Sequence, residues 1–134
     1  MKVTKIPVRT SRRYQLVSIT DEVRRAVKES GVDEGFCIVS SGHTTAAVTL
    51  NEDYDPDVPE DLAAACRALL DALDVDFRHA EGNSDSHFLT SLFGASQYLV
   101  VSGGEPELGR WQGVFLAEFD GPRERVVRVA VGEA

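Results

Sequence analysis

The chain has 134 residues, of which 43% are hydrophobic and 27% charged, and a net charge of -8. This length is typical of one domain, 1–134, that buries its core without a disulfide or a structural metal. No apolar run approaches the roughly 18 residues of a membrane span, and no export signal is visible, so we expect a cytoplasmic protein without a membrane partner. The acidic balance also argues against non-specific binding of nucleic acid, whose affinity comes mainly from cations placed at phosphates.

The first third of the chain predicts the order strand, strand, helix. Residues 2–8 and 14–19 have strand-like composition. Thr20 is placed to cap a helix over 21–30, which has acidic residues in its first turn and Gly31 at its end.

Two β-rich runs follow, at 36–41 and 44–50, with a break between them that contains His43. Small and polar residues inside a β-rich segment are typical of a bend or bulge where the backbone changes direction. Pro59 then favours the first turn of a second helix. Its apolar stripe at helical spacing, which we expect in the core, consists of Leu62, Ala65, Cys66, Leu69 and Leu73.

The polar stretch RHAEGNSDSH, residues 78–87, precedes a short predicted helix. This helix starts at Ser84 or Ser86 and ends at Gly94. His87 then lies in its first turn, where free backbone N–H groups and the positive end of the helix dipole favour an anion such as phosphate.

The last part of the chain predicts three strands, at 97–103, 113–119 and 125–131. The turn residues 120–122, Asp-Gly-Pro, are expected to join the last two strands as a hairpin. Because helices and strands are segregated along the chain rather than strictly alternating, we expect an α+β fold with a largely antiparallel sheet.

Two features of this last part bear on function. Period-2 alternation puts Glu118 on a mostly apolar strand face, where we expect a salt bridge to Arg128 rather than a catalytic acid. The segment GRWQG, Gly109–Gly113, surrounds Trp111 with a guanidinium and an amide, which predicts either a ligand wall or a tight entry into a strand.

Candidate ligands for a metal are few. Three neutral imidazoles can bind zinc or a similar metal and leave an open position for water or substrate. The chain holds that number: His43, His79 and His87. Their spacing matches no compact metal signature, so hydrogen-bonded surface or capping histidines are the alternative. Glu81 and Asp85 fit acid, base or supporting roles but also a solvated loop, and Asn83 fits either a ligand-orienting amide or a turn.

Four motifs in order carry a resemblance to a known family. They are SGHTTAAVTLNEDYDPDV, RHAEGNSDSHFLTSLFGAS, LGRWQG and EFDGPRERVV. Together they resemble the YjbQ-like family, described as secondary thiamine-phosphate synthase enzymes, strongly over Ser41 to Val131 and by pattern alone before that. The resemblance implies a small α+β domain with a half-barrel-like antiparallel sheet, helices packed on it, and assembly as a homotrimer.

The resemblance also assigns residues. His43 matches a His-Thr-(Thr/Ser)-Ala motif, Asn51 and Glu52 an Asn-Glu pair, and Glu118 the acid after the Trp-Gln-Gly segment. From it we expect a divalent metal, zinc or magnesium, at His43, His79 and His87. The expected catalytic residues are His87, Glu52 and Asp85, and the expected substrate-binding residues are Asn51, Asn83, Trp111 and Gln112. This chain departs from the family pattern at Ala80, a position that is often acidic.

The implied reaction condenses hydroxymethylpyrimidine diphosphate with a thiazole phosphate and releases pyrophosphate, as a weak transferase activity on a small phosphorylated substrate. A metal, or the imidazoles with helix N–H groups, would neutralise the charge that develops on the leaving pyrophosphate. Two alternatives stay open: a metal-dependent hydrolase that uses a bound hydroxide, and a non-catalytic trimeric module that binds a small ligand.

Overall fold

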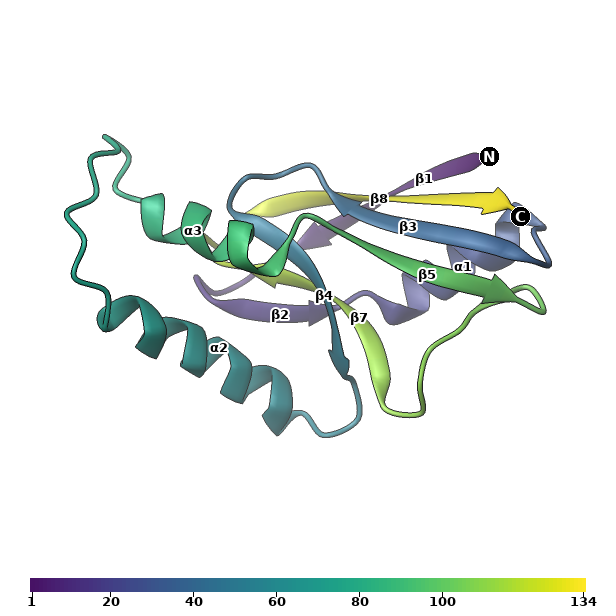
Figure 1. Ribbon diagram of the computed structural model, residues 1–134, viewed down its shortest axis with the longest axis horizontal. Helices are drawn as coiled ribbons and strands as arrows, with labels where there is room; N and C mark the ends of the chain where they lie inside the picture. Colours follow the sequence, from purple (N-terminus) through teal and green to yellow (C-terminus); the bar gives the residue numbers. More distant parts are fainter.

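The computed structural model describes residues 1–134 (Figure 1). Eight strands form most of the fold, and each pairs antiparallel with its neighbours. The strands are β1 Lys2–Arg9, β2 Gln15–Ser18, β3 Gly35–Ser41, β4 Ala46–Glu52, β5 Ser96–Ser102, β6 Glu105–Pro106, β7 Gln112–Glu118 and β8 Glu124–Glu133. The helices are α1 Thr20–Ser30, α2 Asp57–Asp71 and α3 Ser84–Phe93. No helix is both long and apolar enough to cross a bilayer.

The strands divide between two sheets. The larger sheet has the order β1-β8-β3-β5-β6, and the smaller has the order β2-β7-β4. Together they curl into a half-barrel with α1 at one end and with α2 and α3 beside the smaller sheet (Figure 1). The expected α+β domain with a half-barrel-like antiparallel sheet is therefore confirmed.

Strand β7 separates two apolar clusters. Val114 and Leu116 belong to the main core, which the larger sheet and α1 complete. Phe115 and Ala117 face the opposite way, into a smaller cluster beneath α2 and α3. The alternation expected for this strand is confirmed, and it makes β7 buried on both faces, because helices cover the side that solvent would otherwise reach.

Two sequence predictions near the strand ends are wrong. The turn at residues 120–122 does not close a hairpin, because β7 and β8 lie in different sheets and the turn carries the chain between them. Thr20 does not cap α1: its hydroxyl donates to Asp53 Oδ2 at 2.7 Å and accepts from Val114 N at 2.9 Å. Both errors arise because a local signal cannot show which distant strand a residue will meet.

The apolar stripe predicted for the second helix is only partly buried. Ala63 and Cys66 are the buried residues of α2, whereas Leu69 is 45% exposed. Ala65 is exposed as well, and Leu73 follows the end of the helix. The helix lies on the outer side of the small sheet, so only a narrow strip of it reaches the core.

This difference in burial predicts different costs for two leucine truncations. We expect Leu89→Ala in α3 to lower the free energy of unfolding by about 2–5 kcal/mol, because Leu89 is fully buried and its loss leaves a cavity. The matched change Leu69→Ala in α2 should cost less than about 1 kcal/mol, as expected for an exposed position. Urea unfolding of both variants measures this, and equal costs would contradict the described packing of α2.

Candidate functional site

The break between β3 and β4 is held against the end of α3. Ser41 N donates to Ala95 O at 2.8 Å, and Val48 N donates to Gly94 O at 3.3 Å. The Ser41 hydroxyl bridges the bend, since it donates to Ala46 O at 2.7 Å and accepts from His43 N at 3.2 Å. These bonds carry His43 to the side of α3, although the two segments lie far apart in the sequence.

A cavity of about 460 Å³ lies where the bend meets α3. His43 and Thr44 line it from the bend, and the rest of the lining comes from one side of α3 and from the residues that follow it: His87, Thr90, Ser91, Gly94 and Ala95. Positions 87, 90, 91 and 94 repeat at helical spacing and therefore share one face. Two of the three histidines, His43 and His87, therefore line the same cavity.

His43 is held as a neutral imidazole. The backbone N–H of Val126 donates to His43 Nε2 at 2.9 Å, so Nε2 carries no proton and Nδ1 does. Burial lowers the pKa of His43, and the positive charge of Arg125 lowers it further, so the ring is uncharged at pH 7. The Nδ1–H group makes no hydrogen bond within the chain and is free to donate to a ligand.

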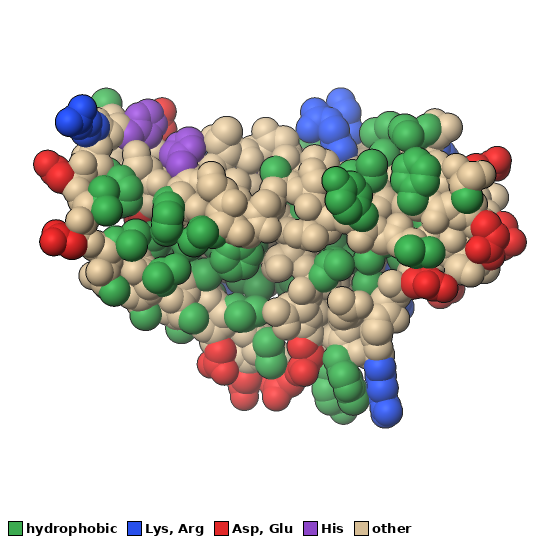
Figure 2. Space-filling view, viewed as in Figure 1, with side chains coloured by type: hydrophobic (Ala, Val, Ile, Leu, Met, Phe, Trp, Pro, Cys, Tyr) green, Lys and Arg blue, Asp and Glu red, His purple; other side chains and the backbone are tan.

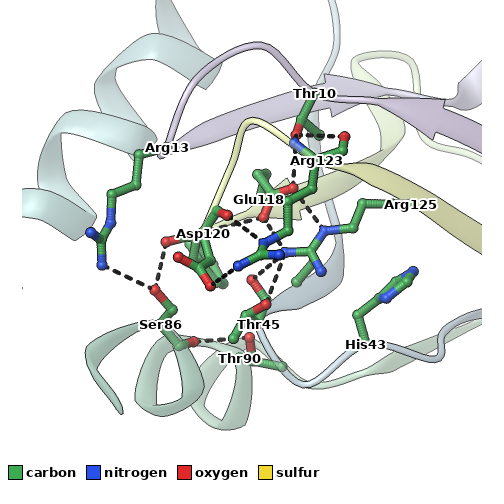
Figure 3. Close-up of polar contacts among 12 residues, drawn as sticks. Thr10, Arg13, His43, Thr45, Ser86, Thr90, Glu118, Asp120, Arg123 and Arg125 are labelled. Carbon is green, nitrogen blue, oxygen red and sulfur yellow. Dashed lines mark hydrogen bonds and ion pairs between the residues drawn. The ribbon is translucent and has the colours of Figure 1, made fainter. Parts of the chain in front are cut away.

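A buried ion pair between Arg125 and Glu118 holds the bend in place. The Arg125 guanidinium donates through Nε to Glu118 Oε1 at 2.8 Å and through Nη2 to the Thr45 hydroxyl at 2.9 Å (Figure 3). Thr10 Oγ1 and the Asp120 N–H also donate to the Glu118 carboxylate. Both members of the pair are buried, with Glu118 fully so. Arg125 thus joins β7 and β8 to Thr45, which lies two residues after His43 in the bend.

The sequence prediction of a Glu118 salt bridge is right in kind but wrong in partner. The inward side chains of β8 are Arg125, Val127 and Val129, so Arg128 points to the other face of the larger sheet. There Arg128 is exposed and takes part in no salt bridge. Its guanidinium lies next to Gly42 in the bend, because a Cβ on Gly42 would be only 2.8 Å from Arg128 Nη1.

The pKa of Glu118 reflects two opposed effects. Burial by itself would raise it, but the hydrogen bonds from Arg125, the Asp120 N–H and Thr10 outweigh burial and hold the pKa below its usual value. A carboxyl with a depressed pKa stabilises the fold above the unfolded-state pKa, and that contribution is lost as the pH falls through the folded-state pKa.

The three histidines do not form one metal centre within the chain. The rings of His79 and His87 are 5.6 Å apart between centroids in an edge-on arrangement, and His87 shares the cavity with His43. No group of three or more His, Cys, Asp or Glu side chains is placed to hold a metal ion. Nε2 of His43 is already occupied by the Val126 N–H group. The residues of a single chain therefore do not fit the expected three-histidine site.

The start of α3 is already occupied by a carboxylate of its own. Asp85 Oδ1 accepts the N–H of Ser86 at 2.8 Å, and Arg13 pairs with Asp85 at 3.2 Å. Asn83 is buried and donates to Asp120 Oδ2 at 2.8 Å, whereas its Oδ1 has no hydrogen-bond partner. One N–H group at this helix start is thus bound by a carboxylate of the helix itself, and Asp85 is held in an ion pair.

The remaining predicted site residues lie at the other end of β4 and β7. Glu52 pairs with Gln112 across these strands, and Asn51 pairs with Gly113. Seven strand residues separate this end from the bend, which corresponds to about 20 Å at the usual rise of a strand. Glu52 and Trp111 line a pocket of their own with Tyr54. The motif residues therefore form two groups, not one site.

Sequence reasoning missed several cavity residues. Thr44, Thr90 and Ser91 carry the hydroxyl groups around the two histidines. The helical spacing of 87, 90 and 91 was available from the sequence, but the bend that completes the cavity was not. Arg125 was also missed, because its inward direction depends on how β8 enters the larger sheet.

Comparison with known proteins gives consistent matches. A family model described as "UPF0047 protein YjbQ-like" matches residues 4–134. A UPF0047 protein of Methanocaldococcus jannaschii is 42% identical over 95% of this chain and 91% of its own length. The UPF0047 protein YugU of Bacillus subtilis is 38% identical over 90% of this chain and 91% of its own length. A crystal structure of an uncharacterised conserved protein from Clostridium acetobutylicum superposes with a TM-score of 0.91 at 41% identity, covering 96% of this chain and 99% of that one.

The buried pair makes a stability prediction. Glu118→Gln leaves Arg125 buried without a counter-charge, so we expect it to lower the free energy of unfolding by about 3–5 kcal/mol at pH 7. The variant should also lose less stability than wild type as the pH falls through the acid range, because the carboxyl with the depressed pKa is gone.

The matched control is Glu124→Gln, which breaks the exposed pair with Arg9, whose side chains are 80% and 75% exposed. This change should cost at most about 1 kcal/mol. Denaturant unfolding at several pH values measures both variants. An equal, small effect of the two changes would show that the buried pair does not hold the sheets together.

Proposed function

This chain belongs to the YjbQ-like family, UPF0047, and we propose that its cavity at His43 and His87 binds the phosphate end of a small phosphorylated substrate. We further propose that the reaction is a slow, thiamine-phosphate-synthase-like condensation of hydroxymethylpyrimidine diphosphate with a thiazole phosphate. The observation that carries the proposal is a cavity lined by two histidines and by the hydroxyl side chains of Thr44, Thr90 and Ser91, in a chain whose net charge is -8.

The charges around the cavity support an anionic ligand. Arg125 is neutralised by Glu118, but Arg128 at the bend has no acidic partner. His43 offers a free Nδ1–H, and its pKa is lowered first by burial and then by the positive charge of Arg125. An anion bound here gains hydrogen bonds from groups that make none to the protein, which is the condition for a favourable polar contact.

The proposed condensation needs little from the protein besides charge stabilisation. The C–O bond between the pyrimidine methylene and the diphosphate breaks, its electron pair leaves with pyrophosphate, and the thiazole nitrogen forms the new C–N bond with its own lone pair. No activated Ser or Cys is required. His87 and the Nδ1–H of His43 would stabilise the negative charge that develops on the leaving oxygens.

Two predicted roles change under this proposal. Asp85 is paired with Arg13, and Glu52 lies at the far end of β4, so neither carries a step of the transfer. No step is assigned to zinc or magnesium, since the chain's histidines are not arranged to hold one. A non-catalytic binding module is the second candidate, because the cavity contains hydrogen-bond donors but no nucleophile paired with a base.

The test is turnover by purified protein with the two precursors. We expect slow formation of thiamine phosphate, and a loss of about a hundredfold or more in rate for His87→Ala, from the usual cost of removing one charge-stabilising donor. The matched control is His79→Ala, because His79 contacts the His87 ring but does not line the cavity. Product is measured by chromatography, and folding of each variant by thermal unfolding.

The outcomes separate the candidates. Absence of product above a protein-free blank would contradict the synthase assignment. Release of phosphate without condensation would indicate a hydrolase. Full activity of His87→Ala would leave the reaction standing but remove this cavity as its site. Saturable binding of a precursor without turnover would favour the binding module.

We also propose that the protein assembles as a homotrimer through the outer face of the larger sheet. Phe36 pairs with Val100 and Ile38 with Tyr98 across β3 and β5. Tyr98 is 77% and Val100 59% exposed, and Figure 2 shows hydrophobic side chains gathered over this part of the molecule. Contiguous exposed apolar surface of this kind is typical of an interface.

Sedimentation equilibrium tests the assembly. We expect a mass of three chains for the wild type at micromolar concentration and a shift to single chains for Tyr98→Glu, which puts a charge into the apolar face. Arg24→Glu, on the exposed side of α1, is the control and should remain trimeric. A wild type that sediments as a folded monomer contradicts the proposal.

A further inference from the structure

The end of β4 opposite the histidine cavity carries an exposed aromatic pair in a pocket of its own. The rings of Tyr54 and Trp111 are 4.7 Å apart between centroids and tilted by 57°. Tyr54 is 74% exposed and Trp111 45% exposed, so burial in the core does not account for either ring. A hollow of about 650 Å³ adjoins them, and its lining is completed by Glu52, Asp55 and Pro56.

Hydrogen bonds fix the backbone segments that carry the two rings. Asp53 N donates to Trp111 O at 2.7 Å, which ties the two aromatic segments together. Asp53 Oδ2 in turn accepts from the hydroxyls of Ser18 at 2.6 Å and Thr20 at 2.7 Å. Gly113 permits this approach, because a Cβ there would collide with Asp53 and Thr20. Because this backbone is already held, a ligand binds without the cost of ordering the two segments.

The pocket is also negatively charged. The segment NEDYDPD at 51–57 contains four carboxylates. Glu52 and Asp55 line the pocket and accept hydrogen bonds from backbone N–H groups, and neither forms a salt bridge. Figure 2 shows acidic side chains beside hydrophobic ones along the lower edge of the molecule, away from the histidine side chains at the upper left. The two ends therefore differ in the charge that they attract.

The chain already uses this aromatic surface for a cation. The guanidinium of Arg110 lies 4.7 Å over the centre of the Trp111 ring. A positive charge on a ring face is attracted by the ring quadrupole, and nearby carboxylates add to that attraction. Arg110 is exposed and has no salt bridge, so it is free to move aside for a cation from solution.

We propose that this pocket binds a small organic cation, either a quaternary ammonium or a cationic nitrogen heterocycle. Tyr54 and Trp111 contact its positive centre, and Glu52 and Asp55 compensate its charge. A phosphorylated anion is repelled from the same position. The cation site lies about 20 Å along β4 from the histidine cavity, by the rise of a strand, and does not depend on the function proposed for that cavity.

Tryptophan fluorescence tests the site directly, because Trp111 is the only tryptophan of the chain. The probes are choline and its uncharged isostere 3,3-dimethylbutan-1-ol. We expect choline to change the emission saturably and to bind about fivefold more tightly than the alcohol, as exposed cation–π contacts allow. Binding should weaken as salt rises from 0.01 M to about 0.5 M, because part of the attraction is screened.

Variants locate the binding. Tyr54→Leu and Glu52→Gln should each weaken choline binding about fivefold or more, whereas Tyr54→Phe keeps the ring and should bind like wild type. Arg110→Met removes the competing guanidinium and should bind choline more tightly. His87→Ala should leave choline binding unchanged, which separates this test from that of the histidine cavity.

Three results would overturn the cation site. They are equal binding of choline and the alcohol, no saturable change with choline in a folded protein, and undiminished binding by both Tyr54→Leu and Glu52→Gln. Loss of binding by His87→Ala would instead show that the two ends act as one site.

Discussion

The buried ion pair between Glu118 and Arg125 is the contact on which the rest of the structure depends. Glu118 ends a strand of the smaller sheet, and Arg125 begins the last strand of the larger one. The two side chains therefore join the sheets at the point where the chain passes from one to the other. Breaking a pair this deeply buried strongly destabilises the fold, because the remaining charge cannot reach water. This cost forces both sheets to keep one relative position.

The same pair places the chemistry of the bend. Arg125 bonds Thr45, and the next residue of β8, Val126, donates its N–H to His43. The arginine that joins the two sheets thus also holds the bend in place, and its positive charge adds to burial in lowering the pKa of His43. Stability and site chemistry have one origin here. A change that frees Arg125 must alter both the packing of the sheets and the contacts that hold the bend at His43.

The sequence predicts what is local in this structure and misses what is brought together by the fold. The alternation along β7 and the bend at His43 follow from neighbouring residues, and both are found. The partner of Glu118 does not follow, since Arg125 and Arg128 lie on the same strand and only the pairing of β8 decides which one faces inward. Leu69 shows the same limit, because helical spacing identifies an apolar stripe but not how much of it a sheet will cover.

The division of the motif residues into two groups has the same cause. Residues 43 and 52 are close in sequence, yet an extended strand carries them to opposite ends of the molecule. A helix over the same residues would have kept them within about 14 Å, at 1.5 Å per residue. The histidine end offers hydrogen-bond donors, whereas the Trp111 end offers ring faces and carboxylates. One strand therefore separates the two proposed binding sites, which favour opposite charges, and a ligand that engages both must carry both charges.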